Sequence, residues 1–293
     1  MNILKKILLY SIYIIAATAF FLYYLFPSEE IKKYVTLKIN NANPELNIKI
    51  DQIKPAIPPG LKFSNVNLFR EENLLFEAEH IKVAPGLMSL FRPETVLFFK
   101  GKSYDGTWEG KASLVKSDTD SRVQIAGADA VLSGIQIKKI SAIQTSPDYD
   151  ISGILNGNIT HNSSEASEKT TDTKFVISDC EIELSMSDSK LGLLAPVLKS
   201  KKFIFKTINA DITIDNNRKL QIKECIAKGD QANVDLTGSI DLKTPVEKSV
   251  LNLTGSISPH PSFIADLGSA AALIFREGSF PLRIRGTFKN PKL

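Results

Sequence analysis

The sequence is poor in the residues that build most metal, redox and hydrolytic sites. It has only two cysteines, Cys180 and Cys225, and three histidines, and none of them falls in a CxxC pattern or a closely spaced metal-ligand cluster. No GxSxG elbow, P-loop or dinucleotide-binding glycine motif is present. We therefore expect no cofactor and no metal, and predict that the protein is not an enzyme.

The chain also has little excess charge of either sign. The 36 basic residues exceed the 32 acidic residues by only four, and the lysines are spread along the chain. A nucleic-acid-binding surface usually shows a concentrated basic patch, so nucleic acid is not an expected partner.

Long apolar runs are absent with one exception, which lies near the amino terminus. From Ile7 to Phe26 the chain carries no charge, and a stretch of about 20 apolar residues is enough for a helix to cross a bilayer. Lys5 and Lys6 precede this run, which favours a cytoplasmic amino terminus. We predict a cytoplasmic tail over residues 1–6 and a transmembrane helix over residues 7–26.

A cleaved signal peptide is the alternative for this segment. The small residues Ala17-Thr18-Ala19 resemble a cleavage site. Cleavage there would leave the apolar stretch FFLYYLF at the new terminus, so an uncleaved anchor is favoured. With either interpretation the rest of the chain is exported.

A short helix is predicted next, over residues 27–45. Ser28 is placed to cap its start, and Glu29 and Glu30 suit the positive end of a helix dipole. The apolar residues with helical spacing are Ile31, Tyr34, Val35 and Ile39.

The remainder, residues 46–293, has apolar residues at every second position over many short stretches. This period is typical of strands with one buried face, and the closing stretch FPLRIRGTF shows it clearly. Residues 95–114 predict a hairpin with Tyr104-Asp105-Gly106 at the turn. The fold class is therefore mainly β: a transmembrane helix followed by a curved antiparallel sheet with a few short helices, of which residues 261–276 are the clearest.

Glycine recurs on the apolar side of several predicted strands. The pentapeptide LTGSI occurs at Leu236–Ile240 and again at Leu253–Ile257, and ILNGNI and RIRGTF resemble it. Glycines on one face of successive strands would form a seam without side chains, which lets a sheet curl.

A disulfide between the two cysteines depends on which faces they occupy. Cys180 alternates in phase with Ile182, whereas Cys225 is out of phase with Leu220 and Ile222. Bonded cysteines on neighbouring strands need side chains on the same face, so alternation argues against the Cys180–Cys225 pair without excluding it.

Several stretches together resemble the type II secretion protein N family, GspN. They are IKPAIPPGLKFSNVNLF at residues 53–69, VAPGLMSLFRPETVLFFKGKSYDGTWEG at residues 83–110, KSVLNLTGSISP at residues 248–259 and GSFPLRIRGTFKNPKL at residues 278–293. The closing motif also resembles the broader AsmA-like group of envelope proteins. The positions that carry the resemblance are Pro58, Pro59, Gly60, Leu61, Gly106, Gly110, Gly286, Thr287, Asn290 and Pro291.

This resemblance implies a single-pass protein of the bacterial inner membrane with a periplasmic β-rich domain. It implies a structural or adaptor component of the type II secretion apparatus, with secretion proteins as partners and the sheet as the contact surface. The alternative is an AsmA-like lipid-binding or lipid-transfer protein, in which the curved sheet holds lipid acyl chains in an apolar trough.

Overall fold

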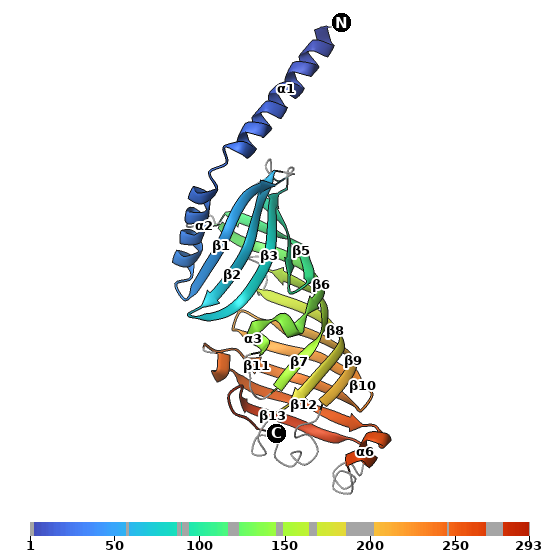
Figure 1. Ribbon diagram of the computed structural model, residues 1–293. Coiled ribbons are helices and arrows are strands. Elements are labelled where there is room, and N and C mark those ends of the chain that lie inside the picture. The colour runs from blue at the N-terminus through green and yellow to red at the C-terminus, as the bar shows by residue number, and fades with distance from the viewer. Residues whose placement is uncertain are drawn as a thin grey trace. The chain divides into compact units, whose positions relative to one another are not determined.

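The protein is described by a computed structural model and is mainly β, as the sequence predicted. The chain divides into two compact units, Met1–Pro85 and Gly86–Leu293, which are described separately below (Figure 1). The structure describes residues 3–56, 59–86, 89, 94–116, 123–144, 149–163, 169–185, 202–244, 246–267 and 278–292.

The first unit begins with two helices. Helix α1 covers Ile3–Tyr24 and α2 covers Ser28–Ala42. The sequence expectation of a helix across Ile7–Phe26 therefore holds as far as Tyr24. Counting only the residues that the structure describes, no helix is both long and apolar enough to cross a membrane.

Helix α2 packs against the antiparallel strands β1 (Leu46–Ala56), β2 (Gly60–Arg70) and β3 (Asn73–Pro85), the first three of a 14-stranded sheet. Ile31 and Val35 of the predicted apolar stripe contact the buried core of this sheet, whereas the Tyr34 side chain is 62% exposed. The core residues of the sheet are Ile50, Ile53, Val66 and Ala78.

Polar side chains of α2 bind the edge of β1 that faces away from β2. The Ser28 hydroxyl donates to the Ile53 carbonyl, and the Lys32 ammonium donates to the Asp51 carbonyl at 3.3 Å. The Ile48 N–H donates to Oδ1 of Asn40 at 3.2 Å. Ser28 is therefore not the helix cap that the sequence suggested, because its hydroxyl binds the strand.

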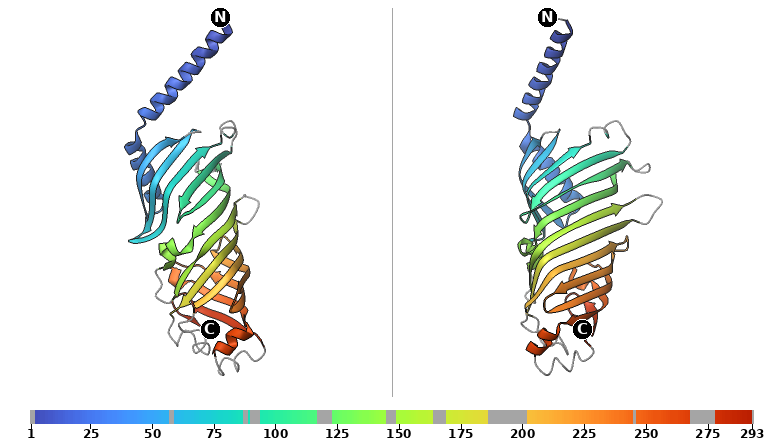
Figure 2. Two further views of the ribbon diagram at one scale, coloured as in Figure 1. Left: turned by 45° about the vertical axis from the view of Figure 1, so that its right-hand side comes forward. Right: turned by 90° about the vertical axis from the view of Figure 1, so that its right-hand side faces the viewer.

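The second unit is an antiparallel meander in which strands adjacent in sequence are paired in space (Figures 1 and 2). Short helical segments η2 (Ile137–Lys139), α3 (Ser141–Gln144), η4 (Val246–Lys248) and α6 (Pro261–Leu267) interrupt it. Its strands are β4 (Thr95–Ser103), β5 (Gly106–Lys116), β6 (Val123–Gln136), β7 (Tyr149–Asn162), β8 (Thr170–Leu184), β9 (Lys202–Ile214), β10 (Lys219–Gly229), β11 (Ala232–Asp241), β12 (Val250–Pro259), β13 (Phe280–Thr287) and β14 (Pro291–Lys292).

The turn between β4 and β5 forms where the sequence predicted it. Tyr104 and Asp105 have φ of 52° and 62°, and Ser103 pairs with Gly106 across the turn. Two successive residues with positive φ match the twist of a tight hairpin. Lys139 holds this turn by an ion pair of 2.5 Å to Asp105.

The two LTGSI repeats pair with each other in the β11–β12 hairpin. Leu236 lies opposite Gly255 and Gly238 lies opposite Leu253, so each leucine faces the glycine of the other repeat. A Cβ on Gly255 would lie 1.8 Å from the Asp235 carbonyl oxygen, which no side chain tolerates. Close backbone approach, rather than an open seam, explains this repeat.

Other glycines of the second unit are covered by aromatic rings from the neighbouring strand. Gly101 lies opposite Trp108, and Gly110 lies opposite Phe99. In both pairs the ring occupies the space that a glycine Cβ would need, with approaches of 2.3 Å and 2.7 Å. Gly157 of ILNGNI is covered in the same way by Phe175, which lies opposite it and approaches to 2.5 Å, so the expectation of a seam free of side chains is wrong at Gly157.

Candidate functional site

An apolar hollow lies on the sheet of the second unit. It has a volume of about 300 Å³ and is lined by side chains from five consecutive strands, β8 to β12. Its lining residues are Ile182, Phe203, Phe205, Ile208, Cys225, Ala227, Val234, Leu236 and Ile257.

Strand alternation brings these side chains to one face of the sheet. Across β10, β11 and β12, Ala227 lies opposite Val234, which in turn lies opposite Ile257. Further along the same strands, Cys225 lies opposite Leu236. Side chains on one face of a strand recur at every second residue, so each such position adds one row of apolar side chains that runs across the strands.

Bulges keep the lining on one face where simple alternation would break it. The β10 register shifts between Ile222 and Cys225 against β11, so both residues face the apolar side. On β8, Asp179 has φ of 50° where the alternation changes phase, and Ile177 and Cys180 both pack in the apolar cluster. A bulge adds one residue to a strand and reverses the faces beyond it.

Aromatic rings close one end of the hollow. Phe203 stacks on Phe205 with ring centroids 6.4 Å apart, and Phe263 of α6 meets Phe203 edge-on at 5.9 Å. All three rings are buried in the same cluster, together with Leu282 of β13. Edge-on and stacked pairs at these distances are favourable arrangements of aromatic rings.

Both cysteines face this apolar region, contrary to the prediction from alternation. Cys180 is fully buried and Cys225 lines the hollow, and both are free thiols. Burial, together with the neighbouring Glu181 charge, raises the pKa of Cys180 to about 11. Burial also raises the pKa of Cys225. A raised pKa keeps the thiolate scarce at neutral pH, so neither cysteine is an activated nucleophile.

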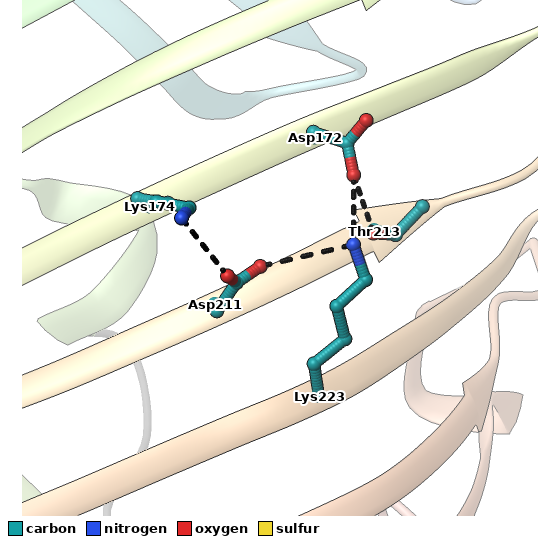
Figure 3. A network of polar contacts seen from close by, with 5 residues as sticks. All are labelled: Asp172, Lys174, Asp211, Thr213 and Lys223. Carbon is teal, nitrogen blue, oxygen red and sulfur yellow. Dashed lines mark hydrogen bonds and ion pairs between the residues drawn. The ribbon is translucent and has the colours of Figure 1, made fainter.

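A network of charges lies on the opposite face of the sheet and joins three strands (Figure 3). Lys223 of β10 reaches across β9 to Asp172 of β8 at 3.1 Å and lies 4.0 Å from Asp211. Lys174 pairs with Asp211 at 3.4 Å, and the Thr213 hydroxyl donates to Asp172 at 2.6 Å.

The geometry of this network indicates that it fixes the register of neighbouring strands and is not a catalytic site. Its lysines are more than half exposed, and each carboxylate is held by a cation or hydroxyl. The hydrogen bond from Thr213, followed by that from Lys223, lowers the pKa of Asp172. A carboxylate with a lowered pKa is a poor general base, since catalysis favours a pKa near the working pH.

A smaller polar hollow of about 150 Å³ lies at the ends of β7, β8 and β9. Lys202 pairs with Glu181 at 2.7 Å across it, and this hydrogen bond raises the pKa of Lys202. The residues that line this polar hollow are Lys138, Asp150, Ser152, Glu181, Glu183 and Lys202.

Within the described residues no group of three His, Cys, Asp or Glu side chains is arranged to hold a metal ion.

The positions that carry the family resemblance do not converge on one site. Pro58 lies outside the described residues, while Pro59, Gly60 and Leu61 form the entry to β2 in the first unit. The others are Gly106 at the start of β5, Gly110 under Phe99, and Gly286, Thr287, Asn290 and Pro291 in the β13–β14 turn.

The β13–β14 turn shows what the closing motif does. Gly286 has φ of 96°, a conformation that favours glycine, and Asn290 N–H donates to the Thr287 carbonyl at 3.0 Å. Pro291 then pairs with Gly286 across the turn. The motif folds the last residues back onto β13, so it is structural.

Comparisons with family models, with curated proteins and with solved structures yield no match. The apolar hollow was the feature that sequence reasoning could not place, because its residues come from five strands whose register depends on bulges. The alternating apolar residues on each strand were the available signal.

Proposed function

We propose that the second unit binds an apolar chain, the acyl chain of a lipid, in the hollow on its sheet. The observation that carries this proposal is an apolar cavity of about 300 Å³ on the sheet, bordered by packed apolar clusters. Ligand sites are typically concave, largely apolar and of this size. Each buried methylene of a chain contributes about 0.8 kcal/mol.

The protein acts by binding rather than by chemistry in this proposal. Among the described residues, the lining offers no carboxylate, hydroxyl, amide or imidazole, and its one ionisable group is the Cys225 thiol with its raised pKa. General acid–base catalysis requires a group within hydrogen-bond reach of the substrate. A lining of this kind supports a non-enzymatic carrier or holder of lipid.

We further propose that α1 holds the chain in the bacterial inner membrane, with the amino terminus in the cytoplasm and both units in the periplasm. Apolar side chains are exposed on every side of this helix: Ile7, Leu8, Leu9 and Tyr10 are each at least 60% exposed. The uncharged run Ile7–Phe26 has the length of a helix that crosses a bilayer core, although the described part of α1 does not by itself reach the length and hydropathy of a span. Exposed apolar surface on all sides is typical of a helix surrounded by lipid.

The resemblance to GspN favours a second function, that of an adaptor in type II secretion. Secretion-apparatus proteins would then be partners, and the sheet would provide the contact surface. Strand addition at β1 would require the displacement of α2, because Ser28, Lys32 and Asn40 already bind the backbone of that edge. The contact would therefore use another surface of the sheet.

Photo-cross-linking in cells distinguishes the two functions. A benzophenone amino acid is placed at Leu236, which lines the hollow, or at Asp235, the neighbouring residue on the exposed face. Lipid binding predicts an acyl-labelled adduct at position 236 and none at 235. Adducts to secretion proteins with no lipid adduct at 236 would overturn lipid binding and support the adaptor.

A filling substitution provides a second test on the same full-length chain. Ala227→Phe places a ring inside the hollow, whereas Lys228→Phe places the same ring on the exposed face of the same strand. We expect co-purifying lipid to be lost from A227F and kept by K228F. Equal lipid content in both variants would show that the lipid is bound elsewhere.

A further inference from the structure

One end of the hollow lies where β8, β10 and β12 end and where β9 and β11 begin. In the outermost row Ile182 lies opposite Phe203, and the next row places Phe205 opposite Cys180. The rows further in contain Ala227 and Val234, followed by Cys225 and Leu236. Helix α6 starts two residues after Pro259, the last residue of β12, and therefore lies at the same end.

Phe263 of α6 stands behind the outermost row and does not itself line the hollow. It is 8% exposed, and its ring meets the Phe203 ring edge-on at 5.9 Å. Phe203 does line the hollow, and its ring stacks on that of Phe205. The Phe203–Phe263 pair thus forms a wall across this end.

Gln231 fixes the position of that wall. Its side-chain amide accepts a hydrogen bond from the Ile204 N–H at 3.0 Å and donates one to the Lys202 carbonyl at 3.0 Å. Its own backbone carbonyl accepts the His260 N–H at 2.8 Å, directly before α6. The start of β9, which carries Phe203, and the start of α6, which carries Phe263, are therefore tied to one residue.

Aliphatic side chains border the other direction along the hollow. Gly255 lies opposite Leu236, and Gly238, the next position on the same face of β11, lies between Ile222 and Leu253. The Ile222 and Leu253 side chains pack in a neighbouring apolar cluster. Among the described residues, the aromatic rings that line the hollow therefore stand at the Phe203–Phe263 end.

We infer that the Phe203–Phe263 ring pair is the end stop of the hollow and sets the length of acyl chain that the protein prefers. The inference rests on the proposed lipid-binding function. A methyl end that reaches Phe203 cannot advance, because Phe263 blocks movement of that ring and Gln231 holds both elements. Each methylene up to the stop gains about fourfold in affinity, the factor that corresponds to about 0.8 kcal/mol. Carbons beyond the stop gain nothing.

The test uses the full chain held in an amphipathic polymer after removal of detergent. Unbranched saturated fatty acids that increase by two carbons are used to displace a fluorescent fatty acid. For the wild type we expect affinity to rise with length and then to level off. For Phe263→Ala the levelling should move to longer chains, because Phe203 can then turn into the vacated space.

Ile264→Ala is the matched control, since it removes apolar volume from the same helix and cluster without touching the ring pair. Levelling at the same length in wild type, F263A and I264A would overturn the end stop and leave lipid binding intact. Failure of every fatty acid to bind the wild type would overturn both proposals. If circular dichroism shows that F263A does not fold, Phe263→Leu keeps the helix buried, and the same shift to longer chains is required of it.

Discussion

The two thiols of the apolar region differ in their accessibility to a reagent in solution, and labelling each cysteine separately tests this difference. Cys180 is fully buried with a pKa of about 11, whereas Cys225 lines the hollow. We expect an apolar maleimide at neutral pH to modify Cys225 and to leave Cys180 unmodified, as read by mass spectrometry of peptides. The rate at Cys225 should rise about tenfold per pH unit, because the thiolate is the reactive form and its pKa is raised.

A ligand in the hollow should slow this modification. Added fatty acid is expected to protect Cys225, while Cys225→Ser removes the labelled site and identifies the peptide. Faster labelling of Cys180 than of Cys225 would contradict the placement of both residues.

Asp172 makes a pH-dependent contribution to stability. Its pKa is lowered in the folded state, chiefly by the Thr213 hydroxyl and then by Lys223. The contribution is therefore present above the pKa of an unfolded aspartate, about 4, and is lost as pH falls through the lower folded value. We expect Asp172→Asn to reduce the free energy of unfolding by about 0.5 kcal/mol at neutral pH and by nothing at acidic pH, since exposed pairs are weak.

Urea unfolding at neutral and at acidic pH measures this difference. Asp241→Asn is a suitable control, because it removes an exposed carboxylate at the end of β11 and leaves the three-strand network intact. A loss of stability in D172N that is equal at both pH values would show that the charge of Asp172 is not the cause.

At the scale of single elements, α2 covers a strand edge that would otherwise be exposed. Ser28, Lys32 and Asn40 bind three backbone groups of β1 that would otherwise be open to another strand. We expect the triple variant Ser28→Ala, Lys32→Met, Asn40→Leu to lose about 3 kcal/mol of stability, about 1 kcal/mol for each of the three hydrogen bonds. Its self-association should increase in analytical ultracentrifugation.

The control for this variant changes residues of α2 that do not contact the strand edge. Glu30→Ala with Lys33→Met alters exposed positions of the helix and should leave the oligomeric state unchanged. Equal association of both variants would indicate that apolar surface in general, rather than the β1 edge, drives it.

Alternation along the chain predicted the strands of both units and the β4–β5 turn, because these depend on neighbours in sequence. It failed at Cys225, where a bulge that depends on pairing with β11 moves the residue to the other face. The expected glycine seam also failed at Gly157, because Phe175 from a partner strand covers it. What the sequence could not reveal is therefore the register between strands, and the apolar hollow is a product of that register.

At the scale of the whole molecule, the division into two units at Pro85 and Gly86 also escaped prediction, since no change of composition marks it. In the first unit α2 covers the apolar face of its sheet with Ile31 and Val35. In the second unit α6 contributes Phe263 at one end and leaves the hollow beside it. The apolar sheet face is thus covered by a helix in the first unit, whereas in the second unit the described residues leave a hollow on it.

The proposed anchoring of the whole chain depends on α1, whose apolar side chains contact no other part of the described chain closely enough to be buried. We expect the wild-type chain to remain in the membrane fraction after carbonate extraction. Ile12→Lys combined with Ala16→Lys should release it, because each lysine near the centre of a spanning helix costs about 3 kcal/mol. Tyr24→Lys, at the end of α1, is the control and should remain membrane-bound, since a lysine there can reach the interface. Release of the wild type by carbonate would mean that α1 is covered by a protein partner instead of lipid.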